Sequence, residues 1–391
     1  MREKQIQSIT GMSLSELEAL CVSMGEPAYR AKQILSWVYE KGATTFDQMS
    51  NLPKDFKKLL AEKYQVFQTK VDTIMQTVEQ HSRNRITPPL SPPCERGEVG
   101  GVKKLAKKEE FLQGKIIDGT EKFLVHLPDE NVIECVLLRE SKRVTACVST
   151  QVGCAMACQF CASGLLGLER NLTAGEIVEQ ALHVKNHLPP DERLTNIVFM
   201  GIGEPLANYD NVVKSIRIIN AEWGLGIGAR HITVSTVGMV DGIRRLALEG
   251  LQVNLAISLH APNDIIRSKI IPSNKKTGIK NIIASAQEYF DVTRRDISFE
   301  YILIDGINAS KQDAESLARL LKGIQCNINI LPLNPIKEFN FRPPPQETIE
   351  MFCKTLERQG LIVTLRKKKG NDINAACGQL RLKNINFYGK N

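Results

Sequence analysis

The sequence contains no long hydrophobic run, although 42% of its 391 residues are hydrophobic. No apolar stretch approaches the ~20 residues that a helix needs to cross a bilayer. The first ten residues, MREKQIQSIT, also lack the apolar segment of a secretory signal peptide. We therefore expect a cytoplasmic protein without a membrane partner, and the length is enough for two or three domains.

The sequence also lacks paired metal-ligand motifs. It has ten cysteines, and in a long cytosolic chain cysteines more often bind metal or act in catalysis than form disulfides. Cys147, Cys154, Cys158 and Cys161 fall within fifteen positions. No second cysteine pair lies nearby in sequence and the loop has no histidine, so a closed zinc site with four local ligands is disfavoured.

Positive charge is in modest excess. The formal net charge is +8, which fits a polyanionic partner such as nucleic acid, but a solvated basic surface explains it equally well. A denser basic run, RKKKG at 366–370, follows an apolar stretch. This run faces either phosphates or water.

Changes of composition divide the chain into four expected parts. Residues 1–68 are expected to form a small basic helical module. Residues 69–140 are expected to form a connecting β segment with an insertion at 82–110, where many Pro, Gly and charged residues and few large apolar ones predict disorder. Residues 141–345 are expected to form an α/β unit, and residues 346–391 a C-terminal extension.

Capping residues and hydrophobic periodicity give the elements. Ser13 and Pro27 mark the starts of two helices in the N-terminal module, and Gly25 and Gly42 mark their ends. From position 143 onward, apolar strands alternate with helical stretches, which is typical of a parallel sheet, either barrel-like or doubly wound. The strands are expected over 143–150, 195–201, 231–238, 253–261, 297–304 and 328–335, with a last strand near 361–368.

The spacing C-x3-C-x2-C at Cys154, Cys158 and Cys161 is the strongest chemical signal. Thiolates bind zinc and iron–sulfur clusters. A [4Fe–4S] cluster that is bound by only three cysteines has one iron open to a small molecule. The alternative is a zinc knuckle with a distant fourth ligand.

These motifs together resemble the RlmN/Cfr family of radical S-adenosylmethionine (radical SAM) RNA adenine methyltransferases. The resemblance is carried by ACVSTQVGCAMACQFCASG, VFMGIGEPLANYDNVV, HITVSTVG, AISLHAPND, LPLNP and GNDINAACGQL, and by the N-terminal GEPAYRAKQILSWVYEKGATTFDQMSNLPKDFKKLL. It spans nearly the whole chain except the insertion at 82–110, which is not part of the family pattern. Ile202 stands where the family often has Met. The match favours the RlmN branch, whose members act on carbon 2 of adenine in 23S ribosomal RNA and transfer RNA.

The resemblance implies a fold, two cofactors and their contacts. The fold would be an α/β partial (βα)6 radical SAM barrel, and a [4Fe–4S] cluster would be bound by the three motif cysteines. S-adenosylmethionine would bind the open iron and a further set of residues, namely Gly203, Glu204, Ser235, Ser258, Leu259, His260 and Asn334. On sequence alone, a glycine turn with a Glu is usually only a turn, and His260 would be a satisfied structural histidine. We also expect Gly201 and Gly203 to let the backbone approach the ligand closely.

The resemblance also assigns catalytic roles to Cys377, Cys147 and Glu134. In the family, the cysteine matching Cys377 receives a methyl group from a first S-adenosylmethionine. A radical from a second one takes a hydrogen atom from that methyl group, and the resulting methylene radical adds to adenine. The cysteine matching Cys147 then forms a disulfide and releases methylated RNA, with Glu134 as proton acceptor. Without the resemblance, both cysteines would be buried structural residues and Glu134 a surface residue on a strand.

The expected partners are 23S ribosomal RNA, transfer RNA and a reduced flavodoxin or ferredoxin as electron donor, with the protein acting as a monomer. Basic residues of the helical module are expected to grip phosphates, namely Arg30, Lys32, Lys54, Lys57 and Lys58. Two alternatives stay open. One is a Cfr-type enzyme that methylates carbon 8, and the other is a non-catalytic iron–sulfur or zinc RNA-binding protein, which would need neither Cys147 nor Cys377.

Overall fold

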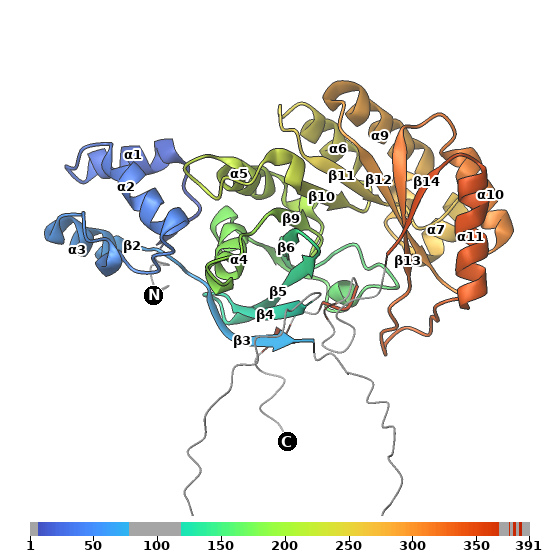
Figure 1. Cartoon of the computed structure of the whole chain (residues 1–391), viewed down its shortest axis with the longest axis horizontal. Coiled ribbons are helices and arrows are strands. Elements are labelled where there is room, and N and C mark those ends of the chain that lie inside the picture. The colour runs from blue at the N-terminus through green and yellow to red at the C-terminus, as the bar shows by residue number, and fades with distance from the viewer. Residues whose placement is uncertain (1–6, 78–118, 367–374, 376–377, 381–382, 385–391) are drawn as a thin grey trace, which may run out of the picture.

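A computed structural model of the chain describes residues 7–77, 119–366, 375, 378–380 and 383–384. The insertion expected at 82–110 and Cys377 lie outside the described residues. Figure 1 shows the N-terminal helices at one end of the molecule and α10 and α11 at the other, with a large sheet between them. None of the helices in the described ranges is both long enough and apolar enough to cross a membrane.

The N-terminal helices begin and end where their capping residues predict. The Ser13 side chain accepts a hydrogen bond from the Glu16 N–H, and the Glu16 carboxylate accepts one from the Ser13 N–H. Gly25 and Gly42 lie beyond the helix ends with φ of 79° and 71°, a conformation that glycine adopts without strain. The elements are β1 (Gln7–Ser8), α1 (Leu14–Ser23), α2 (Arg30–Leu35), the π-helix η1 (Ser36–Glu40), the 3-10 helix η2 (Phe46–Gln48), α3 (Lys54–Lys63) and β2 (Tyr64–Gln65).

The centre of the fold is a run of seven parallel strands whose spatial order equals their order in the chain. They are β6 (Arg143–Cys147), β9 (Asn196–Phe199), β10 (Ile232–Thr236), β11 (Asn254–Ser258), β12 (Ile297–Leu303), β13 (Cys326–Pro332) and β14 (Ile362–Leu365). A helix follows each of the first six strands, and β6 and β14 lie far apart in the strand order, so the barrel is partial. This arrangement confirms the expected α/β radical SAM fold, and all seven strands were predicted.

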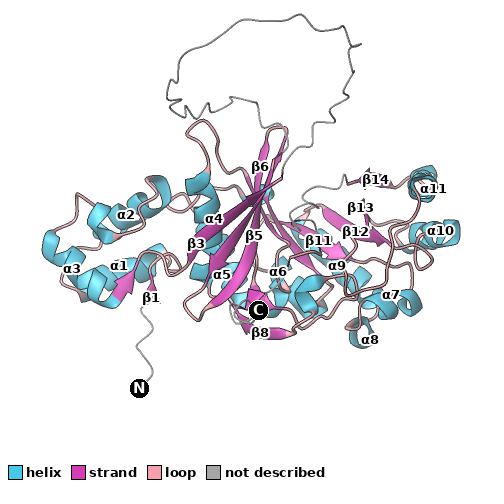
Figure 2. Cartoon of the chain, turned by 90° about the horizontal axis from the view of Figure 1, so that it is seen from below, coloured by secondary structure: helices cyan, strands magenta, loops and turns pink. Residues whose placement is uncertain are grey.

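The connections carry the helices, which lie on the outside of the sheet (Figures 1 and 2). The main helices are α4 (Ala174–His187), α5 (Tyr209–Asn220), α6 (Val240–Ala247), α9 (Ile279–Thr293), α10 (Lys311–Leu320) and α11 (Gln346–Arg358). Shorter ones are η3 (Ala162–Gly164), η4 (Pro205–Asn208), η5 (Ala229–His231), α7 (Asp264–Ile270) and α8 (Asn274–Thr277).

Antiparallel strands extend the sheet beyond β6. In order outward they are β5 (Asn131–Glu140), β4 (Thr120–His126) and β3 (Lys70–Gln76), and β15 (Lys383–Asn384) also pairs with β5. A separate two-stranded sheet, β7 (Gln151–Gly153) with β8 (Leu168–Asn171), flanks the cysteine loop. The loop therefore follows β7 and not the first barrel strand directly, because residues 151–153 pair with β8.

The two faces of the parallel sheet differ in polarity. On the outer face, Val234, Leu255 and Phe299 are fully buried and form part of the hydrophobic core. On the inner face, Ser258 of β11 lies opposite Glu300 of β12 in the parallel register, and residues in register point to the same side. Parallel strands that are buried on both faces are normally apolar throughout. The polar inner face therefore indicates a barrel whose interior is lined to hold a polar group.

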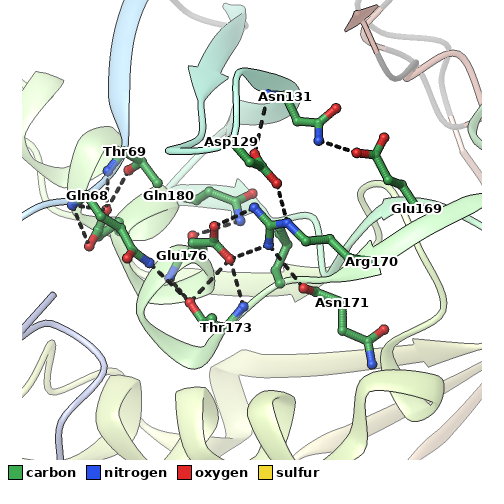
Figure 3. A network of polar contacts seen from close by, with 12 residues as sticks. Gln68, Thr69, Asp129, Asn131, Glu169, Arg170, Asn171, Thr173, Glu176 and Gln180 are labelled. Atoms are coloured by element: carbon green, nitrogen blue, oxygen red, sulfur yellow. Dashed lines mark hydrogen bonds and ion pairs between the residues drawn. The ribbon is translucent and has the colours of Figure 1, made fainter. Parts of the chain in front are cut away.

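The start of α4 joins the linker after the N-terminal module to the barrel. Figure 3 shows Gln68 donating to the Thr173 side chain, and Arg170 donating to both Glu176 and Asp129. The helix is capped by Thr173, whose hydroxyl accepts from the Glu176 N–H. Deeper in α4, the buried Glu179 accepts hydrogen bonds from residues on both sides of the module, which fixes the module against the barrel.

Candidate functional site

A cavity of about 170 Å³ opens at the C-terminal ends of the parallel strands, which is where α/β folds place their sites. It is lined by residues from the cysteine loop and from strands β9 to β13. Eight of the residues predicted from sequence lie in its wall, namely Cys154, Cys158, Cys161, Gly203, Glu204, Ser235, Ser258 and His260. Residues up to about 106 positions apart in the chain thus meet in one cavity, because parallel strands bring their ends to the same edge.

The cysteine loop is fixed by backbone contacts on both sides. The Cys154 N–H donates to the Gly167 carbonyl at 2.9 Å, and the Gln159 N–H donates to the Ile270 carbonyl at 2.9 Å. Ala157 between the first two cysteines has φ of 51°, an uncommon conformation for a residue other than glycine. The loop therefore has one defined shape that faces all three thiols toward the cavity.

The thiols fit a cationic group better than they fit an empty cavity. Burial raises the pKa of Cys154 to about 12 and that of Cys158 still further, and the neighbouring thiols add to both increases. Thiolates at these positions therefore need positive charge, which an iron–sulfur cluster supplies when it is bound. Within the described ranges, no three His, Cys, Asp or Glu side chains converge as the ligands of one metal ion would.

Gly201 and Gly203 serve the protein rather than the ligand, which corrects the reason expected for them. A Cβ on Gly201 would lie 2.7 Å from the Ser149 backbone nitrogen, and one on Gly203 would lie 2.6 Å from Gln151 Cβ. Gly203 also has φ of 108°, which other residues rarely adopt. The two glycines let the end of β9 pack against the segment that leads to the cysteine loop.

Glu204 is buried and holds the neighbouring strand end. Its carboxylate accepts hydrogen bonds from the Val237 N–H at 2.7 Å and from the Leu206 N–H at 3.0 Å. Burial raises the pKa of Glu204, and hydrogen bonds from Val237, Thr236 and Leu206 oppose that increase. Glu204 thus places the turn after β10 at the cavity wall.

His260 has a defined tautomer. Its Nδ1 accepts a hydrogen bond from the Ile302 N–H at 3.0 Å, so the proton of the neutral ring is on Nε2. Burial lowers the pKa of His260 to about 3, with the positive charge of Arg267 as the next cause. The ring packs edge-on against Phe160 of the cysteine loop, with centroids 4.9 Å apart. His260 is therefore a neutral donor in the cavity wall.

Two predicted cofactor contacts lie outside the cavity wall. Leu259 is fully buried, and its backbone carbonyl accepts from Arg267. Asn334 follows β13 by two residues and is half-buried. Neither residue is among those that line the cavity.

The predicted catalytic residues Glu134 and Cys147 lie on adjacent strands, also outside the cavity wall. Cys147 is directly opposite Val136, so Glu134, two positions earlier on β5, points to the same face. Glu134 is buried, not a surface residue, and its carboxylate lies 3.1 Å from Lys122 Nζ. Cys147 is 8% exposed, and its neighbour Cys135 is a fully buried thiol whose pKa is raised by burial.

The C-terminal segment reaches the cysteine loop. The Gly378 carbonyl accepts from the Ala162 N–H at 2.7 Å, and the Leu380 carbonyl accepts from the Ser163 hydroxyl at 2.9 Å. Gly378 also lines the cavity. Cys377 itself lies outside the described residues, but the residue that follows it belongs to the cavity wall.

Sequence reasoning did not find Glu300 and Arg366, which also line the cavity. The Glu300 carboxylate accepts from Asn329 Nδ2 at 2.7 Å. Burial raises the pKa of Glu300, and Arg366 and Asn329 oppose that increase. The available signal was a charged residue inside the otherwise apolar strand ISFEYILI.

Known families match both parts of the chain. The family model of the ribosomal RNA large subunit methyltransferase N-terminal domain matches residues 7–66, and that of the radical SAM superfamily matches residues 148–321. The cavity with three cysteines at the strand ends and the second of these matches define a radical SAM enzyme. Its family implies a [4Fe–4S] cluster and S-adenosylmethionine as cofactors.

Relatives with the same full-length organisation identify the family. A probable dual-specificity RNA methyltransferase RlmN from Symbiobacterium thermophilum is 42% identical over 96% of this chain and 91% of its own. The corresponding protein of Clostridium perfringens is 42% identical over 98% and 99%. The crystal structure of a radical SAM methyltransferase from Sphaerobacter thermophilus matches with a TM-score of 0.83 at 40% identity, covering 96% of this chain and 99% of that one. The chain belongs to the RlmN family and is an S-adenosylmethionine-dependent RNA methyltransferase.

Proposed function

We propose that this enzyme methylates carbon 2 of an adenine in 23S ribosomal RNA and in transfer RNA, through a methylated Cys377 and a covalent RNA intermediate. The observation that carries the proposal is the position of Gly378. The residue next to Cys377 lines the same cavity as the three motif cysteines. A methyl carrier at this place would act directly at the site of the radical chemistry.

The residues of the cavity wall fit the two cofactors. Cys154, Cys158 and Cys161 would hold the cluster, and Gly203, Glu204, Ser235, Ser258 and His260 would contact S-adenosylmethionine. Leu259 and Asn334 are retained as proposed contacts that would act through the backbone or after rearrangement. When bound, the two cofactors supply the radical chemistry that an electron-poor carbon such as carbon 2 of adenine requires.

The chain's own residues would carry the group transfer and the release. Covalent catalysis through Cys377 divides the transfer into easier steps. In the release step, the Cys147 thiolate attacks the Cys377 sulfur, the S–S bond forms and the S–C bond breaks. The electron pair of that bond goes to the carbon, which gains a proton as the methyl group forms. We propose that Glu134 accepts the proton that the adenine loses, since it shares a face with Cys147.

The RNA side of the proposal involves the N-terminal module and an unstacked adenine. Removing a base from its stack costs a few kcal/mol. Lys32, Lys54 and Lys58 are exposed and are available to phosphates. Arg30 and Lys57 already contact the chain itself, since Arg30 donates to Glu26 at 3.1 Å and Lys57 to the Asp47 carbonyl at 3.2 Å. A reduced flavodoxin or ferredoxin is the proposed electron donor.

Analysis of the modified nucleoside tests the proposal. The reduced, cluster-loaded enzyme is incubated with S-adenosylmethionine and either a 23S ribosomal RNA fragment or transfer RNA, and the digested RNA is analysed by mass spectrometry. We expect 2-methyladenosine from both RNAs. 8-Methyladenosine would show the carbon 8 enzyme, and no modified adenosine from a loaded enzyme would contradict the proposal.

A further inference from the structure

Arg267 is a buried arginine behind the cavity wall. Its side chain belongs to α7, it is 1% exposed, and four hydrogen bonds hold the guanidinium within the described ranges. All four go to neutral oxygen atoms, which are the carbonyls of Val237, Ser258 and Leu259 and the side-chain oxygen of Asn274. A buried charge without an ion pair is expensive, so its presence calls for a functional explanation.

The hydrogen bonds of Arg267 fix the cavity wall. Val237 follows β10, while Ser258 and Leu259 lie at the end of β11, so one planar group joins two strand ends. Ser258 Oγ belongs to the wall, and Leu259 directly precedes His260. The planar fork of five donors suits this role, because a lysine ammonium has only three donors on a flexible stem.

The charge of Arg267 also acts on the cysteine loop. The carbonyl of Ile270, at the end of α7, accepts from the N–H of Gln159, next to Cys158. Arg267 and Cys158 influence each other electrostatically, since each lists among the causes of the other's pKa shift. Burial lowers the pKa of Arg267 to about 10, so the guanidinium remains charged at neutral pH.

We propose that Arg267 is a positioning residue that keeps a fixed positive charge beside Cys158 and thereby raises the reduction potential of the cluster. Reduction adds one negative charge to the cluster, and a nearby buried cation stabilises the reduced form in a low-dielectric environment. Outer contacts of this kind tune metal centres in general. The inference rests on the cluster proposed at Cys154, Cys158 and Cys161.

The test is a redox titration of the cluster, followed by electron paramagnetic resonance, in anaerobically reconstituted full-length protein. The variants are Arg267→Gln and Arg267→Met, which remove the charge, and Arg267→Lys, which keeps a charge but loses the fork. Arg295→Met is the matched control, since Arg295 is a partly buried arginine that precedes β12, at the opposite end of the strands. Iron and sulfide content are measured first for every sample.

We expect the neutral variants to lower the equilibrium constant for one-electron reduction by roughly tenfold, which is about 59 mV toward more negative potential. Arg267→Lys should stay close to the unaltered chain, and Arg295→Met should not change the potential. Failure of both neutral variants to take up a cluster, while Arg267→Lys takes one up, would also support a need for charge.

Three results would overturn the inference. They are an unchanged potential in a loaded neutral variant, equal shifts in the lysine and neutral variants, and loss of the cluster in all three variants. If the unaltered chain itself takes up no iron and sulfide, the proposed function fails instead, so the two failures are distinguishable.

Discussion

Replacement of Glu179 should release the N-terminal module from the barrel. The Glu179 carboxylate is fully buried on α4 and accepts from the hydroxyls of Ser8 at 2.7 Å and Thr10 at 2.6 Å. On the linker side, it accepts from the Thr69 N–H at 2.8 Å and the Gln68 N–H at 3.1 Å. Its partners are more than 100 positions away in sequence, so it joins segments that the chain itself keeps apart.

The magnitude depends on which donors can find another acceptor. The Ser8 hydroxyl also reaches the Val66 carbonyl at 2.8 Å, so it retains a partner when the carboxylate is removed. The two backbone N–H groups have no such freedom, and a buried donor without a partner costs about 1–3 kcal/mol. Glu179→Ala should therefore lower the free energy of unfolding by about 2–6 kcal/mol. Burial raises the pKa of Glu179, so Glu179→Gln, which avoids the buried charge, should cost less.

The assay is urea unfolding of the full chain, with hydrogen exchange measured on peptides that contain Gln68 and Thr69. We expect faster exchange at these two amides in Glu179→Ala. Glu288→Ala is the control, since Glu288 forms an exposed ion pair with Arg244 and such pairs contribute little. A free energy of unfolding equal to that of the control, or unchanged exchange at Thr69, would refute the reasoning.

Three further changes have defined outcomes. Gly201→Ala should lower the free energy of unfolding by about 1–3 kcal/mol, measured by denaturant unfolding, because the new Cβ would lie 2.7 Å from Ser149; Gly228→Ala, with only an ordinary contact at 3.5 Å, should be tolerated. Burial lowers the pKa of His183 to about 4 from 6.5, so stability should fall as pH drops from about 6.5 toward 4, and thermal unfolding of His183→Gln should show less of this pH dependence. Combined replacement of Lys32, Lys54 and Lys58 by Ala should reduce the slope of RNA affinity against salt, by about 0.7–0.9 per phosphate contact; an unchanged slope would place the RNA elsewhere.

The sequence was sufficient to predict the order of the barrel strands, because each is a short apolar run between turn residues and is followed by a helical period. The meeting of Cys154, Ser258 and His260 in one cavity followed from the same pattern, since parallel strands end at one edge. The capping signals at Ser13 and Gly25 were equally local, and the structure confirms both.

The long-range polar contacts could not be predicted in this way. Glu179 and Arg267 look like ordinary charged residues on helical stretches, and only the fold shows that their partners are distant segments. Gly203 was assigned to ligand approach, but its neighbour is Gln151, because a glycine in a sequence does not show which surface approaches it. Sequence patterns therefore identify which residues gather at a site, whereas packing decides what each one contacts.

The most direct test of the two-cysteine mechanism is mass spectrometry of the Cys377 peptide from anaerobically purified protein, beside the Cys147→Ala variant. Our account predicts a one-carbon modification on Cys377 and, in the variant, RNA that stays covalently bound to the same peptide, because no thiol is present to release it. An unmodified Cys377 and no trapped RNA, in protein that carries a full cluster, would contradict the account at its central step.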